Sequence, residues 1–467
     1  MGHFTGGQPS PEWDELVRRS RRRFLLGAAA FSIGGPLLAA CSDDDGDSDS
    51  AEAEPTDAAG AEDTTTTGEG EEAAPSGDLP EVTIGYVTPR TGPLAPFGEA
   101  DDFVLASIGA ALGATVTIID KDSESDPAVA GDVTNELIAE GANLILVSST
   151  PDTTIPVAAA CARDGVPCLS TMAPWQPHYL NTGGALGPDA PDPPEAANEW
   201  NYHFFWGLED IIANFIELWD TLGVDQVVGG LWPNDPDGLA WSDAAAGFPP
   251  ALEAAGYTVV DPGRFELDIQ DFTAIINQFK DEGVTIVSGV VPPPVFAIFQ
   301  AQAIQQDLQV SVITIAKAAL FPSAAESFPA GAGITTEVWW TAGHPFTSSL
   351  TGQSAAELAA EFEAGGAQWT QPLGFAHALF EVAADVLRRA GGTDAVAIRD
   401  AIAATTLDTV VGPVDFASGT GPVPNIAKTP MVMGQWVEGD TYPLELAVVQ
   451  NSGLPDVPVD AEPQLMA

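Results

Sequence analysis

Short apolar segments alternate with amphipathic segments along most of this chain from residue 81 onward. The apolar segments are rich in β-branched and aliphatic side chains, a pattern that predicts buried strands. The segments between them have helical spacing; Val129, Val133 and Leu137, for example, recur every four residues and are followed by a stop at Gly141. The predicted strands are residues 82–87, 115–119, 144–147, 166–170, 227–232, 257–260, 285–290 and 310–315, and helices of the second half are predicted near residues 209–222, 271–282 and 294–306.

This alternation predicts an α/β fold with parallel sheets that are covered by helices on both faces. The patterned part, residues 81–453, is longer than one hydrophobic core usually serves, so two doubly wound lobes are expected. Ligands of such sheets bind beyond the carboxyl ends of the strands. The loops that follow the predicted strands are therefore the first candidates for a binding site.

A different pattern precedes the alternating part. Ser20-Arg21-Arg22-Arg23-Phe24-Leu25-Leu26 resembles a twin-arginine export signal, and the apolar run that follows ends in Leu38-Ala39-Ala40-Cys41, which resembles a bacterial lipoprotein box. The run is too short to span a bilayer as a helix, and it has the basic flank of an export signal. By this resemblance, residues 1–40 are a signal and Cys41 becomes the lipidated first residue, held at the outer face of the cell membrane. An uncleaved N-terminal anchor is the alternative.

An acidic segment joins Cys41 to the alternating part. Residues 42–80 contain 14 Asp or Glu, no Lys or Arg, and four consecutive threonines. Such a composition cannot bury enough apolar surface to offset the entropy lost on ordering, so residues 41–80 are expected to form a disordered tether. An acidic tail that recruits a partner is the alternative interpretation.

The charge balance excludes one class of partner. Of the 67 acidic and 15 basic residues of the chain, 50 and 10 remain when the tether's 14 acids and the signal's 3 acids and 5 bases are set aside. No basic stripe is available to neutralise phosphates, which argues against nucleic acid. The negative charge favours solubility without naming a function.

Enzyme motifs are missing from the sequence. There is no GxGxxG after the first strand, no phosphate-loop lysine motif and no GxSxG elbow, so neither a cofactor nor an enzymatic activity is expected. The four histidines of the alternating part have no recognisable triad spacing; they are His178, His203, His344 and His377.

Two cysteines lie close together in the first half. Cys161 is predicted on the last turn of a helix that stops at Gly165, and Cys168 on the strand that follows. A short disulfide is feasible between such positions, and two buried free thiols are the alternative. Without a histidine at ligand spacing, the pair does not make a metal site.

Several motifs together carry a family resemblance. Ile84-Gly85, Pro89, Thr91-Gly92-Pro93 and Phe97-Gly98 resemble the opening of the branched-chain amino-acid-binding proteins of ABC importers, which have the type I periplasmic binding protein fold. The resemblance continues in the same order along the chain, at Asp126-Pro127, Pro156, Gly165-Val166-Pro167, Asn234-Asp235-Pro236-Asp237-Gly238, Asp271-Phe272 and Gly374-Phe375-Ala376.

This resemblance implies two lobes joined by three crossovers, near Trp206, Val338 and Pro424, with the ligand clasped between them. Lobe 1 would comprise residues 81–205 and 339–424, lobe 2 residues 206–338 and 425–453, and a tail residues 454–467. The implied protein is a monomer that delivers its ligand to a membrane permease with ATPase subunits. A ligand-sensing domain that signals to a membrane receptor is the alternative.

The family's ligand contacts can be transferred to lobe 1 by position. Ligand carboxylates would meet hydroxyl and N–H groups of the loop after the third strand, and the next loop would add further contacts, although Pro174 and Trp175 replace the family's usual small residue and threonine. The implied residues are Ser148, Ser149, Thr150, Thr171, Met172, Ala173, Trp175 and the aromatic Phe97.

Lobe 2 departs further from the family. Asp237 stands where a tyrosine is common, and Lys317 lies in the loop where amino-acid binders often place an acid. Lys317 and Arg90 in one cleft would favour an anionic group, so we expect a small carboxylated ligand, amino-acid-like or an organic or aromatic acid. A lysine that reaches solvent and an exposed arginine are the alternatives. Further candidates of the cleft are Trp232, Asp235 and Val290, with Trp206 and Trp241 as aromatic walls.

Overall fold

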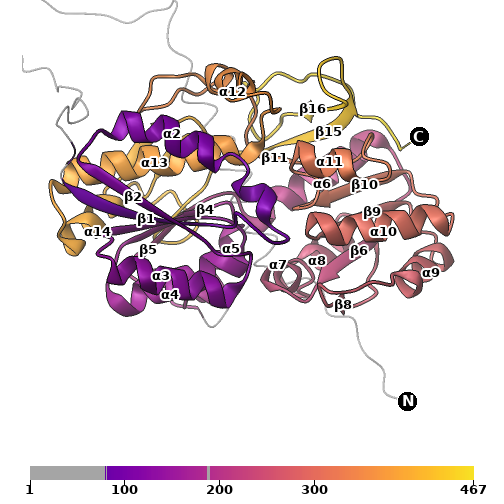
Figure 1. Cartoon of the computed structure of the whole chain (residues 1–467). Helices are drawn as coiled ribbons and strands as arrows, with labels where there is room; N and C mark the ends of the chain where they lie inside the picture. Colours follow the sequence, from indigo (N-terminus) through magenta and orange to yellow (C-terminus); the bar gives the residue numbers. More distant parts are fainter. Residues whose placement is uncertain (1–78, 80, 187–189, 467) are drawn as a thin grey trace, which may run out of the picture. The chain divides into compact units, whose positions relative to one another are not determined.

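A computed structural model describes residue 79, residues 81–186 and residues 190–466 (Figure 1). The predicted signal, Cys41 and the tether therefore lie outside the described residues. In the described part, no helix is long and apolar enough to cross a membrane. All described residues belong to one compact unit, within which the predicted α/β fold with two parallel sheets is confirmed.

The first sheet forms lobe 1 and is parallel throughout, in the strand order β14-β5-β4-β3-β1-β2. Its strands are β1 (Val82–Thr88), β2 (Val116–Asp122), β3 (Leu144–Ser148), β4 (Cys168–Thr171), β5 (Asn201–Phe204) and β14 (Ile426–Ala427). The other elements of lobe 1 are η1 (Ala95–Gly98), α2 (Asp101–Leu112), α3 (Pro127–Ala139), α4 (Pro151–Asp164), α5 (Trp175–Asn181), α12 (Ala355–Glu363), α13 (Gln371–Ala390), α14 (Ala395–Ala403) and the hairpin of β12 (Thr406–Thr409) and β13 (Gly412–Asp415). Helices α3 and α4 cover one face of the sheet, and α2 and α13 cover the other (Figure 1).

The second sheet forms lobe 2, in the order β16-β15-β11-β10-β9-β6-β7, with β8 beside β6. Its strands are β6 (Val227–Pro233), β7 (Thr258–Val260), β8 (Arg264–Phe265), β9 (Ile286–Val290), β10 (Val312–Ala316), β11 (Thr335–Val338), β15 (Val432–Glu438) and β16 (Leu444–Gln450). Its helices are α6 (Leu208–Leu222), α7 (Pro236–Trp241), α8 (Phe248–Ala254), α9 (Thr273–Asp281), α10 (Pro293–Gln305) and α11 (Pro322–Ser327). Only the last two strands, β15 and β16, are antiparallel to their neighbours.

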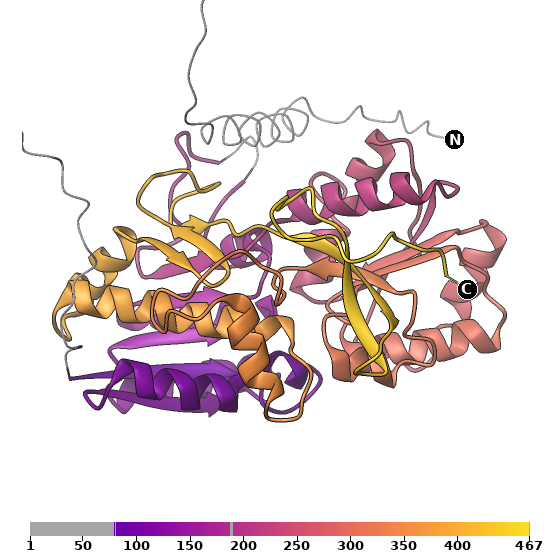
Figure 2. The same ribbon diagram turned by 90° about the horizontal axis from the view of Figure 1, so that it is seen from above.

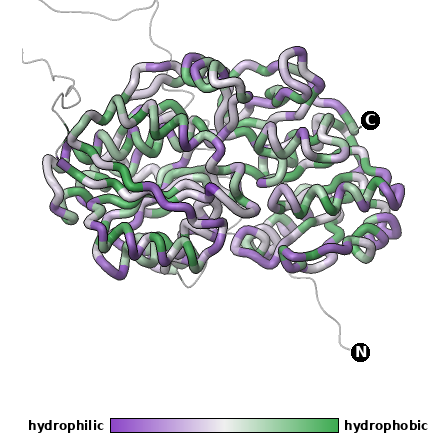
Figure 3. Tube along the Cα trace, viewed as in Figure 1, coloured by the Kyte–Doolittle hydropathy of each residue, from purple (hydrophilic) through white to green (hydrophobic). Residues whose placement is uncertain are grey.

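Apolar strands and the buried surfaces of the helices build the two cores. Between the first sheet and helices α3 and α4, Leu137, Val157 and Ile145 are fully buried. In lobe 2, Phe215 of α6 packs against Phe248 of α8, and these helices lie on the face of the sheet opposite α10 (Figure 2). Hydrophobic residues accordingly follow the strands through both lobes (Figure 3). Each fully buried aliphatic side chain contributes roughly 1.5–3 kcal/mol.

The segment around Cys161 and Cys168 has the predicted secondary structure. Helix α4 ends at Gly165, whose φ of 67° closes the helix in a conformation that glycine adopts without strain, and β4 begins at Cys168. Among the described residues, both thiols are buried and free, so the structure has two buried free thiols and not the disulfide. Burial raises the pKa of the Cys161 thiol well above its usual value, which makes it a poor nucleophile.

The chain passes between the two sheets three times. It leaves β5 for α6 through residues 205–207, and it leaves β11 for α12 through residues 339–354. The first of these crossovers contains Trp206, and the second begins directly after Val338. The third leads from β14 to β15 through residues 428–431. The two lobes are thus connected by three separate chain segments, an arrangement that can act as a hinge.

The third crossover differs from the prediction. We expected it near Pro424, with residues 425–453 in lobe 2, but β14 pairs with β5 and therefore belongs to lobe 1. Strand β14 has only two residues, which is too short to give a strand signal in the sequence. Lys428 follows β14 directly, and its ammonium contacts Glu209 (2.7 Å) and Asp210 (2.6 Å) at the start of α6. These two contacts tie the third crossover to the first turn of α6, directly after the first crossover.

Candidate ligand-binding cleft

The carboxyl ends of the two parallel sheets face each other across a small cavity. Its volume is about 20 Å³, room for about one water molecule. The cavity is lined by Phe97, Thr150, Met172, Pro174, Phe205, Trp206, Asp237, Trp241, Val290, Ala316, Lys317, Leu320, Glu337 and Trp339. Most of these residues lie at the ends of strands or in the loops that follow them, which is where doubly wound sheets place their binding sites.

Aromatic side chains from both lobes form much of the cavity wall. Phe97 stacks on Trp339 with ring centroids 6.4 Å apart, and its edge meets Phe321 of lobe 2 at 4.9 Å. Phe205 contacts both Trp206 (4.8 Å) and Trp339 (5.1 Å). These rings close the cleft with apolar surface.

Polar donors without acceptors lie in the same wall. The indole nitrogens of Trp206, Trp241 and Trp339 are buried, and none of them has a hydrogen-bond partner among the described residues. The hydroxyl of Ser149, next to the cavity residue Thr150, is also buried without a partner there. Three indole donors around one cavity, with the Ser149 hydroxyl on the residue before the cavity residue Thr150, suit a ligand that offers hydrogen-bond acceptors.

One lysine and several carboxylates lie at the lobe 2 side of the cavity. The ammonium of Lys317, which follows β10, lies 2.6 Å from Asp237 of α7 and 3.3 Å from Asp235, the residue that caps α7. It also lies 3.7 Å from Asp152, in the first turn of α4 in lobe 1. Lys317 therefore bridges the two lobes through carboxylates.

The backbone of Lys317 is held in an unusual conformation. Its φ is 63°, in the left-handed region, and the N–H of Ala318 donates to the carbonyl of Ala316 across it (2.6 Å). The N–H of Lys317 itself donates to Glu337 Oε1 (3.3 Å), at the end of β11. This conformation is strained for a lysine, and it persists only where the surrounding structure fixes it.

Burial and mutual attraction shift the acidity of these groups in opposite directions. Burial alone would lower the pKa of Lys317, but attraction to Asp235, Asp237 and Asp152 outweighs burial and raises it. Burial raises the pKa of Asp237 to about 7, although the attraction of Lys317 opposes this shift. Burial also raises the pKa of Glu337 to about 8, against hydrogen bonds from the backbone and from Thr336. Asp237 and Glu337 thus change protonation near neutral pH.

Replacing Glu337 by glutamine is expected to flatten the pH dependence of stability. The folded protein holds a proton on Glu337 up to about pH 8, whereas an exposed glutamate loses it near 4.5. The stability contribution of that proton is therefore complete below pH 4.5 and is lost as the pH rises through 8, by up to about 1.4 kcal/mol per pH unit. Urea unfolding between pH 5 and 8.5 measures this slope. An unchanged slope in Glu337→Gln, or an equal change in the exposed control Glu282→Gln, would contradict the assignment.

Comparisons with known proteins identify the architecture. A family model for periplasmic binding proteins matches residues 81–441. The chain belongs to the periplasmic binding protein family. It is accordingly an extracytoplasmic solute-binding protein and not an enzyme. No curated protein matches the chain significantly.

Solved structures share the fold of this periplasmic binding protein at low sequence identity. A leucine-binding protein from Thermotoga maritima is 17% identical, with a TM-score of 0.63 over 79% of this chain and 99% of the other. A branched-chain amino acid transporter substrate-binding protein from Streptococcus pneumoniae, solved with isoleucine, is 17% identical, with a TM-score of 0.61 over 79% and 99%. A solute-binding protein of an ABC transporter from Rhodopseudomonas palustris, solved with 3,4-dihydroxybenzoic acid, is 17% identical, with a TM-score of 0.61 over 79% and 96%.

Several lobe 1 residues that the resemblance implied do lie at the cavity of this periplasmic binding protein. Phe97, Thr150 and Met172 line it. Other implied residues are engaged elsewhere, because their polar groups bond within lobe 1. Ser148 Oγ pairs with the Tyr86 hydroxyl, Thr171 Oγ1 donates to the Phe204 carbonyl, and the Ala173 carbonyl contacts His203 Nε2.

Three other candidates lie away from the cavity lining. Arg90 bonds Asp102 (2.6 Å) and Asp120 (2.9 Å), which hold it at the β2 side of the sheet. Trp175 begins α5, and its indole N–H donates to Glu209 (3.2 Å). Trp232 is fully buried behind Trp241, with ring centroids 6.4 Å apart. The expectation that Arg90 faces the cleft is therefore wrong.

Four of the lobe 2 candidates lie close together in the structure. Asp237, Val290 and Lys317 line the cavity, and Asp235 contacts the Lys317 ammonium. Lys317 is only 4% exposed, so it does not reach solvent. It is also not a free cation, because three carboxylates surround it. The argument that Lys317 favours an anionic ligand does not hold in this geometry.

Sequence reasoning missed several residues of the site, namely Asp152, Phe205, Leu320, Glu337 and Trp339. Two signals were present in the sequence. Glu337 is an acid inside an otherwise strand-like segment, and Asp152 lies in the first turn of the helix after the Ser149-Thr150 loop. An acid in a buried strand usually has a function or a partner.

A larger hollow lies outside the cleft. Its volume is about 330 Å³, and it is lined by residues around Trp369, Tyr442 and Asp460. These residues belong to the region of α12 and the β15–β16 hairpin and not to the carboxyl ends of the parallel strands. Its Glu445 carboxylate already accepts backbone N–H groups of Thr441 and Tyr442. The smaller cavity therefore remains the candidate site.

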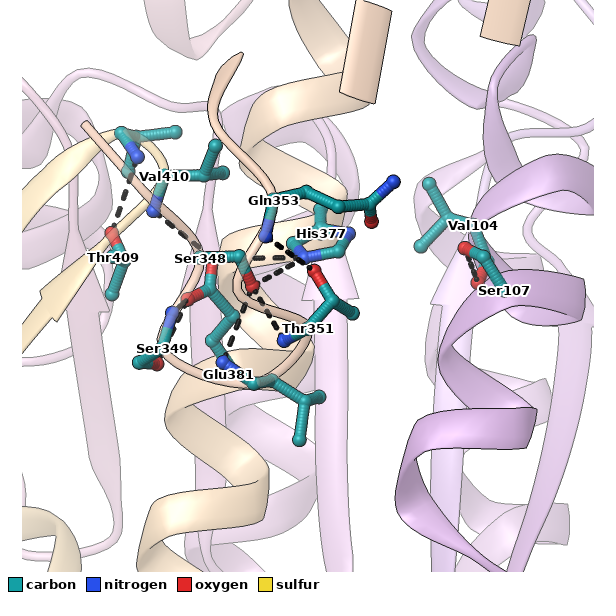
Figure 4. A network of polar contacts seen from close by, with 12 residues as sticks. Val104, Ser107, Ser348, Ser349, Thr351, Gln353, His377, Glu381, Thr409 and Val410 are labelled. Carbon is teal, nitrogen blue, oxygen red and sulfur yellow. Dashed lines mark hydrogen bonds and ion pairs between the residues drawn. The ribbon is translucent and has the colours of Figure 1, made fainter. Parts of the chain in front are cut away.

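One buried cluster superficially resembles a hydrolase triad. Ser348 Oγ lies 2.8 Å from His377 Nε2, and Glu381 lies near the same nitrogen at 3.9 Å (Figure 4). In a working triad the acid would bond the other ring nitrogen, which here has no partner in the described part of the chain. Ser348 Oγ also accepts the N–H groups of Leu350 and Thr351, and Glu381 accepts the N–H of Val410. The cluster thus fastens two loops to α13.

Proposed function

We propose that this protein binds a small carboxylated solute in the cleft between its lobes and delivers it to the permease of an ABC importer. The observation that carries the proposal is a set of four buried donors that find no acceptor among the described residues, namely Ser149 Oγ and the indole nitrogens of Trp206, Trp241 and Trp339. A carboxylate offers two oxygens with several acceptor positions, which suits such donors.

The ligands of structural relatives support this class. The Streptococcus pneumoniae protein was solved with isoleucine, and proteins from Rhodopseudomonas palustris were solved with 3,4-dihydroxybenzoic acid and with p-hydroxybenzoic acid. All three ligands carry a carboxyl group on an apolar body. The aromatic wall of Phe97, Phe205 and Trp339 would cover such a body in this chain.

A thermal-shift screen tests the proposal. Aliphatic, aromatic and amino acids, each at 1 mM, are compared with sugars and polyamines as non-carboxylated controls. A ligand at about 100 times its dissociation constant stabilises the folded protein by about 2.7 kcal/mol, which such a screen resolves. Stabilisation by no carboxylated compound, or by a sugar or polyamine alone, would reject the ligand class.

Ligand binding is expected to require lobe motion. A cavity of about 20 Å³ holds about one water molecule and is too small for a carboxylic acid. The lobes must therefore part about the three crossovers to admit a ligand. Small-angle scattering of the ligand-free protein should therefore show a larger radius of gyration than the complex. Identical radii at saturating ligand would contradict a hinge that closes on the solute.

We also propose export by the twin-arginine route and lipid attachment at Cys41, on the basis of the sequence motifs around these residues. Because lipidation needs the thiol, Cys41→Ser should leave the protein exported but release it from the membrane fraction. Cys161→Ser is the matched control, because that buried thiol is not available for lipidation. Continued membrane association of Cys41→Ser would indicate an uncleaved anchor instead.

A further inference from the structure

The carboxylates of Asp152, Asp235 and Asp237 form a place for a cation. One oxygen of each lies within 4.8 Å of the others, a spacing at which carboxylates can share one positive charge. The Lys317 ammonium lies among these oxygens, at 3.7, 3.3 and 2.6 Å. The cation that occupies this position is therefore the chain's own Lys317 ammonium.

The position of this ammonium is built into the fold. Lys317 is 4% exposed and adopts a left-handed backbone conformation directly after β10, so its stem has no route to solvent. Asp235 is fixed as the cap of α7, since its Oδ1 accepts the N–H of Gly238 (2.7 Å). The Asp152 carboxylate is held by the hydroxyl of Thr150 (3.2 Å). Both anions thus stay in place around the lysine.

The ammonium and one carboxylate also face the ligand. Lys317 and Asp237 both line the cavity with the three tryptophans whose indole N–H groups have no partner in the described part of the chain. A second ammonium on a ligand would lie beside the Lys317 ammonium, and like charges juxtaposed in a buried site are strongly disfavoured. An uncharged hydroxyl would be accepted, because Asp237 Oδ1 has no partner among the described residues.

We propose that Lys317 is a specificity residue, whose ammonium permanently fills the cation position so that the cleft selects carboxylic acids without an ammonium group and rejects the corresponding amino acids. This inference rests on the proposed function, because it divides the carboxylated ligands into two classes. The Lys317 ammonium supplies the positive charge that the α-ammonium group of an amino acid would otherwise bring to this position.

Matched ligand pairs test the inference on the unaltered protein. 4-Methylpentanoate and leucine differ only in the α-ammonium, and so do 3-(4-hydroxyphenyl)propanoate and tyrosine. Calorimetry at pH 7.5 should give at least about hundredfold tighter binding for the acid of whichever pair binds. Equal or tighter binding of the amino acid overturns the inference while leaving the proposed function intact. Binding of neither pair, with no other carboxylate stabilising the protein, rejects the proposed function.

A lysine variant tests the cation position without relying on any carboxylated ligand. Lys317→Ala leaves the carboxylates without their cation, and methylammonium is small enough to replace the missing ammonium. At pH 8, 50 mM methylammonium chloride should raise the melting temperature of Lys317→Ala by several degrees relative to 50 mM sodium chloride. The control variant Lys121→Ala, which also loses two carboxylate contacts but with exposed partners, should show no such difference. No rescue of Lys317→Ala would overturn the cation position.

The same variant should reverse the ligand preference. With the position free, the ammonium of leucine or tyrosine can enter it, so Lys317→Ala should bind the amino acid of a pair more tightly than the acid. Should Lys317→Ala not fold at pH 8, the matched pairs on the unaltered protein still decide the inference. A variant that folds and keeps the preference for the acid would contradict it.

Discussion

Replacing Lys317 by methionine is expected to lower the free energy of unfolding at pH 8 by about 3–5 kcal/mol. Methionine keeps the apolar stem but removes the charge, which leaves Asp152, Asp235 and Asp237 buried together without a cation. Removing one partner of a buried ion pair costs this much because the other charge stays in the low-dielectric interior. Urea unfolding followed by circular dichroism measures the loss.

Two controls separate this effect from a general loss of packing. Lys121→Met removes a half-buried lysine that contacts the exposed Glu136 (3.2 Å) and Glu140 (3.0 Å), and it should have little measurable effect because water screens such surface pairs. The cost of Lys317→Met should also shrink at pH 5.5, where the remaining carboxylates can take up protons. A cost that is independent of pH, or equal for both lysines, would contradict the ion-pair account.

The affinity for a carboxylated ligand is expected to rise as the pH falls from 8.5 to 6.5, by about tenfold to a hundredfold. A bound anion beside Asp237 and Glu337 raises their pKa values above 7 and 8, so binding takes up protons in this range. Each proton taken up changes the dissociation constant by about tenfold per pH unit. When Asp237 and Glu337 ionise, they add negative charge beside the Asp152 and Asp235 side chains, and the single Lys317 ammonium at the same position offsets only part of it. Calorimetry at several pH values measures the slope.

Glu337→Gln is the matched variant for this prediction. It removes one of the two groups that take up protons but keeps the shape of the side chain, so the slope should fall while binding at pH 6.5 stays close to that of the unaltered protein. A ligand affinity that is constant between pH 6.5 and 8.5, or that rises with pH, would contradict proton uptake on binding.

The fold could be predicted from the sequence because its pattern is local. Apolar runs and helical spacing place the strands and helices within a few residues, as the match of β1, β6 and α6 to the expected segments shows. Strand β14 escaped because a pairing of two residues leaves no periodic signal. The third crossover was misplaced for the same reason.

The site could be predicted only in part. The loops at the carboxyl ends follow from topology, and comparison with the family's pattern pointed to Thr150, Asp237 and Lys317 within them; all three line the cavity. Partners across space do not follow from a single sequence. Asp152 lies in the other lobe from Lys317, and the acids that hold Arg90 lie on β2 and α2. Pairing between lobes therefore had to come from the structure.

A crystal structure with the tightest ligand from the screen tests the central claim most directly. The ligand should lie between the two lobes, with a carboxylate oxygen within hydrogen-bond distance of Ser149 Oγ or of an indole nitrogen of Trp206, Trp241 or Trp339. Its apolar body should contact Phe97. A carboxylate bound in the hollow near Trp369, or anywhere outside the cleft, would contradict the account.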